Sequence, residues 1–456
     1  MNRRAGNAGP SLRTLAFVES PVQLLNVLEW AHTHALRGAP GAQASGASAP
    51  ASFPSVPPQV RRTPHGAAPP SAAEPSGSEP SGVVPPGSES SGVVPSGSEP
   101  IGVVPSGAVP SGAESSGVVP SGVESIGAVP SGMAPSGVEL TLVVLSPTDP
   151  MTRGQLRRMA DLARDEGYEV RWEEARGGTT APFQTIGGLA GALRRADRIV
   201  MGDPFSRYVQ LLLTITRARD LVVVDDGTAT MEFVAQLARG ERLVRWHRKG
   251  GRPGPRDLLF APVSSSARRR LTPRAGRRVE VFSSMPVEEI PDGVTITAND
   301  FGWTRARFGP PRITKGADMV GTSLVETGVV DGDRYLEAVR GLAKAHGAAR
   351  YFAHRRESTE KLHRLATETG LEIVRPDLPL ELIARRGPIG RTVLSFPSTV
   401  VHTLPLALAG TGVRVAVCDI DPTWLTDHAS PRAQGFLSGV TDTAKDIHRL
   451  STVALA

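Results

Sequence analysis

The sequence predicts an α/β protein built from two Rossmann-like domains that face each other across a cleft. Predicted strands and amphipathic helices alternate through nearly the whole chain outside one segment, which is the pattern of parallel sheets covered by helices. The alternation comes in two blocks of comparable size, with an irregular stretch at 290–312 between them. Several of the predicted strands end in polar residues, and open α/β sheets bind their ligands at the carboxyl ends of the strands.

Composition sets apart one segment that cannot contribute to a core. Of the 456 residues, those at 38–138 are dominated by Gly, Pro, Ser, Ala and Val and contain repeated units such as SGVVPSGSEP. Proline spaced by glycine and serine prevents both a helix and a continuous strand. We expect a disordered insert there and a disordered amino terminus at 1–11. The other residues, about 350, suffice for two domains.

The N-terminal domain is predicted at 12–290, interrupted by the insert. Its strands are expected at 12–18, 139–146, 168–174, 197–203, 221–224 and 278–286. Its helices are expected at 21–36, 152–167, 189–196, 206–218 and 231–240.

A linker at 291–315 is expected to lead to the C-terminal domain at 316–456. Strands are expected there at 316–326, 349–355, 371–377, 392–399 and 413–420. Helices are expected at 331–347, 358–370, 378–387 and 400–410, followed by a helical tail at 441–455.

The stretch LVVVDDGTAT, at 221–230, is the centre of the N-terminal domain. Four consecutive apolar residues predict a buried parallel strand, and Asp225 and Asp226 follow it directly. At the end of a strand, these carboxylates would stand at the lip of the ligand crevice. Gly227 permits a turn that other residues resist. The alternative is that the pair forms only a strand-end turn with a helix cap.

Polar residues also follow two strands of the C-terminal domain. His354 ends the strand predicted at 349–355, while Ser398 and Thr399 end the strand at 392–399 and open the next helix. Hydroxyl groups and free backbone N–H groups at a helix amino terminus can bind an anion, and a histidine beside them can donate a hydrogen bond to a phosphate. The structural alternatives are a surface histidine for His354 and a plain helix cap for Ser398.

The order and spacing of these motifs resemble those of a known enzyme group. DDG, VGTSLVETGVVDGDRYLEAV, FAHRRES and SFPSTVVHTLPLAL, together with the opening VESPVQLLNVLEW, are similar to motifs of bacterial sialyltransferases. The similar group contains polysialyltransferases and lipooligosaccharide sialyltransferases, which are inverting enzymes of the GT-B fold. The resemblance covers nearly all of the chain outside the insert.

The resemblance implies a role for each motif. The acidic-acidic-glycine motif supplies the general base, which would be Asp225, with Asp226 as the second choice. A His-Pro motif and a Ser-Ser-like motif hold the CMP part of the donor, which implies His354, Ser398 and Thr399.

The resemblance implies two further donor contacts, and the chain differs from the motifs of this group at two positions. Gly321 and Glu326, in GTSLVETG, are placed at the donor, Glu326 at the ribose or cytosine or else in a purely structural turn. Arg355 replaces the proline that follows the motif histidine, and Thr399 replaces the second serine.

The function expected from the resemblance is transfer of sialic acid, or a related nonulosonic acid, from a CMP donor to a cell-surface glycan such as a capsule polysaccharide. A carboxylate can take the proton of the attacking hydroxyl, so the scheme needs neither a metal nor a cofactor beyond the CMP-sugar co-substrate. Asp225 and Asp226 could still bind magnesium, but no third carboxylate ligand stands nearby in the sequence. The alternatives are a GT-B transferase using UDP- or GDP-sugars and a non-catalytic nucleotide- or glycan-binding protein.

Charge and the lengths of apolar runs bear on nucleic-acid binding, cellular location and membrane contact. The net charge of +6 comes largely from arginines at 242–278, which we interpret as a solvated loop and not as a nucleic-acid site, because no aromatic pattern or zinc-finger signature accompanies them. The single cysteine, Cys418, lies in an apolar strand. Without a signal peptide or a membrane span, we expect a cytoplasmic protein whose basic surface allows contact with the inner face of the membrane. The sequence does not indicate an oligomeric state.

Overall fold

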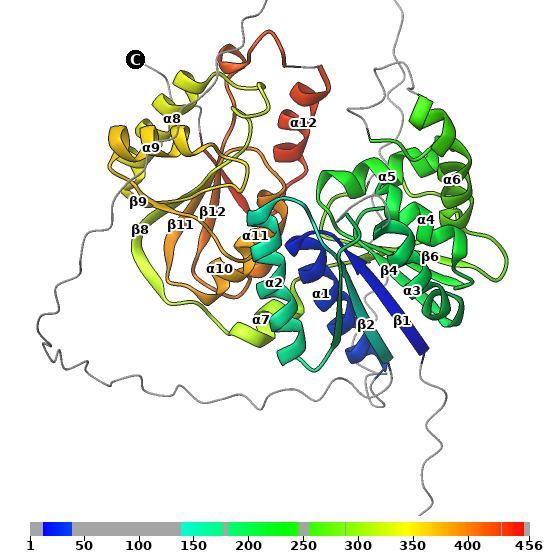
Figure 1. Cartoon of the computed structure of the whole chain (residues 1–456). Coiled ribbons are helices and arrows are strands. Elements are labelled where there is room, and N and C mark those ends of the chain that lie inside the picture. The colour runs from blue at the N-terminus through cyan, green and yellow to red at the C-terminus, as the bar shows by residue number, and fades with distance from the viewer. Residues whose placement is uncertain are drawn as a thin grey trace, which may run out of the picture. The chain divides into compact units, whose positions relative to one another are not determined.

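A computed structural model describes residues 12–38, 138–176, 181–245, 255–287, 289–429 and 431–450 (Figure 1). The amino terminus at 1–11 and the predicted insert, apart from its two end residues, lie outside these ranges. Both halves of the described chain belong to one compact unit. None of the helices in the described ranges combines the length and the apolar character needed to cross a membrane.

The first half is a parallel sheet of seven strands in the order β3-β2-β1-β4-β5-β6-β7. Its strands are β1 (Leu12–Val18), β2 (Val138–Leu145), β3 (Glu169–Glu173), β4 (Arg198–Met201), β5 (Asp220–Val224), β6 (Arg278–Ser283) and β7 (Val294–Ala298). Its helices are α1 (Pro21–Gly38), α2 (Pro150–Asp165), α3 (Ala181–Arg195), α4 (Arg207–Ile215), α5 (Thr228–Ala238), α6 (Pro255–Leu271) and α7 (Gly302–Phe308).

The second half is a parallel sheet of six strands in the order β10-β9-β8-β11-β12-β13. Its strands are β8 (Ile313–Val320), β9 (Ala348–Phe352), β10 (Glu372–Val374), β11 (Ile389–Ser395), β12 (Arg414–Cys418) and β13 (Ile447–Leu450). Its helices are α8 (Gly332–His346), α9 (Thr359–Thr369), α10 (Leu380–Arg386), α11 (Val400–Ala407), the short 3₁₀ helix η2 (Pro422–Trp424) and α12 (Pro431–Asp442).

Both sheets have the strand order of the Rossmann fold, 3-2-1-4-5-6, and the first adds β7 at its edge. The order reverses between β1 and β4 in the first sheet and between β8 and β11 in the second. The prediction of two Rossmann-like α/β halves is therefore confirmed. Loops that follow the strands on either side of each reversal are where such sheets bind ligands.

Helices cover both faces of each sheet because the inner strands bury apolar side chains on both faces. Helices α3 to α6 pack on one face of the first sheet, and α1, α2 and α7 pack on the other. In the second half, α8 and α9 cover one face and α10 and α11 the other. Leu382 of α10 joins the core beneath α1 and α7, so the two halves share one apolar layer.

The described chain breaks off and resumes on the side of the first sheet opposite its ligand-binding edge. The described chain stops at the carboxyl end of α1, at Gly38, and resumes at the start of β2, at Val138. β1 and β2 nevertheless pair in register, Leu12 with Val138 and Val18 with Val144. Both end points belong to the amino ends of the strands, opposite the edge where ligands bind (Figure 1).

Three local predictions were wrong. The stretch at 290–312, predicted as irregular, contains β7 and α7; β7 alternates apolar and threonine residues and fills the open edge of β6. The predicted helical tail contains the strand β13, which pairs with β12. Hydrogen bonding to the open edge of β12 therefore outweighs the local helical pattern. Part of the arginine-rich stretch predicted as a loop forms α6. Pro262 and three serines interrupt the apolar periodicity that would have predicted this helix, although Ala267 and Leu271 pack in the core.

Candidate functional site

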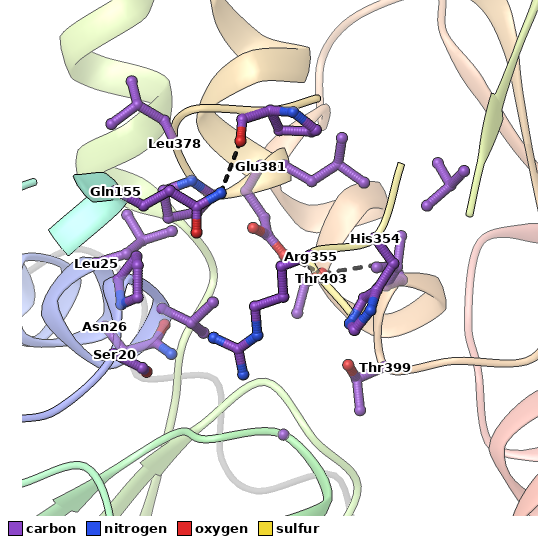
Figure 2. Close-up of a pocket in the computed structure, with 18 of the residues that line it drawn as sticks. Ser20, Leu25, Asn26, Gln155, His354, Arg355, Leu378, Glu381, Thr399 and Thr403 are labelled. Carbon is purple, nitrogen blue, oxygen red and sulfur yellow. Dashed lines mark hydrogen bonds between the residues drawn. The ribbon is translucent and has the colours of Figure 1, made fainter. Parts of the chain in front are cut away.

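Residues of both halves line one cavity, with a volume of about 250 Å³. Its walls are built from the loops after β1, β5, β8, β9 and β11, together with the starts of α1, α10 and α11. Figure 2 shows residues of α1 on one side of this space and His354 and Thr399 on the other. Of the residues predicted from the sequence, those that line it are Asp225, Asp226, Gly227, Gly321, His354 and Thr399.

Both carboxylate oxygens of Asp225 accept hydrogen bonds from residues of the first half. Its Oδ2 accepts from the backbone N–H and the hydroxyl of Ser284, at 3.1 and 2.9 Å, and its Oδ1 accepts from the N–H of Gly227 at 3.0 Å. Only 2% of the residue is exposed. Burial raises the pKa of Asp225, although the hydrogen bonds from Ser284 act in the opposite direction and lower it. Asp225 therefore joins the ends of β5 and β6 and shapes the turn.

The next residue, Asp226, has a freer carboxylate. Among the described residues, Arg245 is the cation that pairs with it: Nη2 of Arg245 lies 3.6 Å from Oδ2 of Asp226 and 2.7 Å from Asp203, which is the stronger partner. Burial, and then the negative charge of Asp203, raises the pKa of Asp226 to about 7. A carboxylate with that pKa at the edge of a cavity can accept a proton at neutral pH.

Gly227 brings the two halves into contact. Its backbone has φ +65°, and a Cβ atom built on it would lie 3.2 Å from Cγ2 of Thr399. Both the left-handed conformation and the close approach favour glycine. The acidic turn of the first half thus lies against the amino terminus of α11 in the second.

His354 lies on a turn after β9 that a buried acid holds in place. Oε2 of Glu357 accepts the backbone N–H of His354 at 2.6 Å, while Oε1 accepts from Tyr351 Oη at 2.6 Å and pairs with Lys361 at 2.8 Å. Glu357 also fills the space beside Gly321, where a Cβ atom would lie 2.2 Å from Oε2. Gly321 therefore has a packing role at the cavity wall.

The imidazole of His354 is neutral with a defined tautomer. Burial, followed by the charges of Arg355 and Arg356, lowers the pKa of His354 to about 4. Its Nδ1 accepts the backbone N–H of Arg356 at 3.2 Å, so the ring proton is on Nε2. The ring can therefore donate a hydrogen bond from Nε2 at neutral pH. Because the imidazole is neutral at that pH, it does not act as a general acid.

The hydroxyl groups before α11 occupy different surroundings. Thr399 lines the cavity at the N-cap position, and its side chain makes no capping hydrogen bond. Ser398 is not among the described residues that line the cavity, and its buried Oγ has no hydrogen-bond partner among them. The structure thus brings Thr399 to the site and leaves Ser398 behind it.

Glu326 lies away from the cavity. Its Oε1 accepts the N–H of Ser358 at 3.2 Å, and its Oε2 lies 3.4 Å from Nζ of Lys361. These contacts join the loop after β8 to the start of α9. They match the structural turn that was the alternative to a donor contact.

Sequence reasoning missed two charged residues in the cavity wall. Glu381 of α10 is buried, accepts the hydroxyl of Thr403 at 2.6 Å, and has a pKa raised by burial. Its signal was a lone carboxylate in the apolar stretch LPLELIA. Arg355 projects into the cavity; its signal was its replacement of the proline of the resembled motif.

The described residues contain no group of three or more His, Cys, Asp or Glu side chains placed to hold a metal ion. Asp203, Asp226 and Arg245 form one ion-paired group in which the guanidinium already contacts both carboxylates. That transfer needs no metal stays a prediction.

Comparison with known proteins finds no matching family model and no matching curated protein. Solved structures with detectable similarity include an α/β-galactoside α-2,3-sialyltransferase from Photobacterium phosphoreum, at 9% identity and a TM-score of 0.36 over 69% of this chain and 92% of that one. A sialyltransferase from Photobacterium damsela has 10% identity and a TM-score of 0.33 over 69% and 75% of the two chains. A UDP-N-acetylglucosamine 2-epimerase from Listeria monocytogenes has 14% identity and a TM-score of 0.36 over 62% and 72%. Similarity at this level places the chain in none of these enzyme families.

Proposed function

We propose that the cavity is the active site of an inverting GT-B glycosyltransferase that transfers sialic acid, or a related nonulosonic acid, from a CMP donor to a glycan. One observation carries the proposal. Asp226 from the first half and His354 and Thr399 from the second half line the same cavity, each after the carboxyl end of a parallel strand. A candidate base from the first half and anion-binding groups from the second half therefore line one space.

The second half supplies the binding groups for the donor phosphate. The Nε2–H of neutral His354 can donate to a phosphate oxygen, and the free hydroxyl of Thr399 can do the same. The amino terminus of α11 adds the positive end of the helix dipole. These groups stabilise the charge that the CMP phosphate gains as it leaves.

The first half supplies the base, and we assign that role to Asp226 in preference to Asp225. The acceptor oxygen forms a bond to the anomeric carbon while the bond from that carbon to the CMP phosphate oxygen breaks. The hydroxyl proton passes to the carboxylate of Asp226, and CMP leaves with the electron pair. Attack from the side opposite the phosphate inverts the anomeric configuration.

The proposal is tested by measuring CMP release and glycan transfer from CMP–sialic acid with the full chain. We expect Asp226→Asn to lower the rate by about 10²- to 10⁴-fold while CMP binding persists. The activity of the unaltered protein should survive EDTA. Unchanged transfer in Asp226→Asn would remove the base assignment. Transfer only from UDP- or GDP-sugars would favour the alternative transferase, and nucleotide binding without any turnover would favour a binding protein.

A further inference from the structure

Arg355 places a positive charge in the cavity, where no described residue pairs with it. Its side chain reaches into the space between residues of α1 on one side and His354 and Thr399 on the other (Figure 2). Among the described residues, none forms a hydrogen bond or an ion pair with its guanidinium. Most of the other arginines that lie near carboxylates pair with them, as Arg245 does with Asp203 at 2.7 Å. An unpaired guanidinium in a cavity is suited to bind an anion.

The guanidinium of Arg355 interacts electrostatically with acids of the first half. Burial lowers the pKa of Arg355, as does the neighbouring Arg356, whereas Asp226 and Asp149 act in the opposite direction. Both of these acids belong to the first half. Figure 2 shows the guanidinium between Ser20 and Asn26 of the first half and Thr399 of the second, in the cavity that Asp226 also lines.

The roles proposed for the other residues of the cavity indicate which oxyanion Arg355 would bind. His354 and the start of α11 suit the phosphate, and Asp226 must lie beside the attacking hydroxyl. The transferred sugar must span the distance between them, so a group bound by Arg355 near Asp226 belongs to that sugar. A guanidinium binds a carboxylate through two parallel N–H donors, which fixes both its position and its orientation.

We propose that Arg355 binds the carboxylate of the transferred sugar and thereby selects acidic over neutral donor sugars. This inference rests on the proposed function of the cavity but is independent of which nucleotide the donor carries. The phosphate of the donor is the other oxyanion that the same guanidinium could bind. The experiment below separates the two.

The experiment is calorimetric titration of CMP, CMP–sialic acid, UDP-glucose and UDP-glucuronate, without acceptor, into the full chain and three variants. Arg355→Gln removes the charge, and Arg355→Lys keeps it without the planar fork. Arg356→Gln is the matched control, because it removes an adjacent arginine that is not among the described residues lining the cavity. Equal melting temperatures check that the variants fold alike.

We expect Arg355→Gln to weaken CMP–sialic acid by about 10- to 100-fold and to leave CMP within about twofold. Arg355→Lys should fall between, and Arg356→Gln should match the unaltered protein. Equal weakening of CMP and CMP–sialic acid would assign the guanidinium to the phosphate and overturn the proposal, as would no change in either. Binding of UDP-glucuronate in preference to both UDP-glucose and CMP–sialic acid, lost in Arg355→Gln, would refute the CMP donor and support the charge selection. Absence of nucleotide binding in the unaltered protein would refute the proposed function itself.

Discussion

Asp225 and Asp226 are adjacent in the chain, but their carboxyl groups face different surroundings. The former accepts three hydrogen bonds from Ser284 and Gly227, whereas the latter faces the cavity beside Arg245. An amide at position 225 has only one acceptor oxygen, so Asp225→Asn should lower the free energy of unfolding by about 1–3 kcal/mol. Asp226→Asn should leave it equal or higher at pH 8, because it removes a buried charge. Chemical denaturation measures both, and the reverse ranking would contradict the division of roles.

The pH dependence of transfer should report the ionisation of Asp226. A base acts in its deprotonated form, and burial raises the pKa of Asp226 to about 7. Below that pH, kcat/KM should therefore rise about tenfold per pH unit, and it should level off above it. His354, with its pKa lowered to about 4, should contribute no ionisation between pH 5 and 9. A profile that is flat from pH 5 to 8 would exclude Asp226 as the base.

At the scale of elements, Glu29 of α1 holds the amino terminus of α7. Its carboxylate accepts from the N–H of Trp303 at 2.8 Å, the N–H of Thr304 at 2.9 Å and the Thr304 hydroxyl at 2.5 Å. This contact positions α7 between α1 and α10. It gives an otherwise weak helix of seven residues its first turn.

The burial of Glu29 predicts a pH-dependent stability. Burial raises the pKa of Glu29 to about 7 from its ordinary value of 4.5, so the folded state holds its proton more tightly than the unfolded state does. Its contribution to stability is fully present below pH 4.5 and is lost as the pH rises through about 7. Relative to Glu29→Gln, the unaltered protein should therefore lose free energy of unfolding between pH 5 and 7.5. A constant difference between the two proteins across that range would contradict the shift.

How far the sequence determines the elements depends on whether the signal is local. Runs such as LVVV at 221–224 and helices with Gly at their ends were predictable because period and caps lie within the segment. β7, β13 and α7 were not, because each is formed by contact with a distant element: the edges of β6 and β12, and Glu29.

The same reasoning applies to the site. The sequence placed Asp226, His354 and Thr399 after strands, and all three reach the cavity. The sequence ranked Asp225 first as the base, and our proposal of Asp226 instead depends on the contact of Asp225 with Ser284, which lies 59 positions further along the chain. The sequence also could not show that Glu326 pairs with the start of α9.

At the scale of the whole molecule, the repeated strand order explains why the site needs both halves. Each sheet presents the loops after its central strands to the same cavity, and α10 and α11 of the second half pack against α7 of the first. In the proposed function, the first half contributes the proton acceptor and the second half contributes the groups that bind the nucleotide. Changes in the first half should therefore affect transfer, and changes around His354 should affect nucleotide binding.

The most direct measurement is calorimetric titration of CMP, CDP, UDP and GDP into the full chain and into His354→Asn. Asparagine can keep the acceptor for the N–H of Arg356 while lacking the Nε2–H donor. We expect CMP to bind in preference to the other nucleotides and to bind about tenfold or more weakly to His354→Asn. Preference for UDP or GDP, or equal CMP binding by both proteins, would contradict the account of this cavity as a CMP-sugar site.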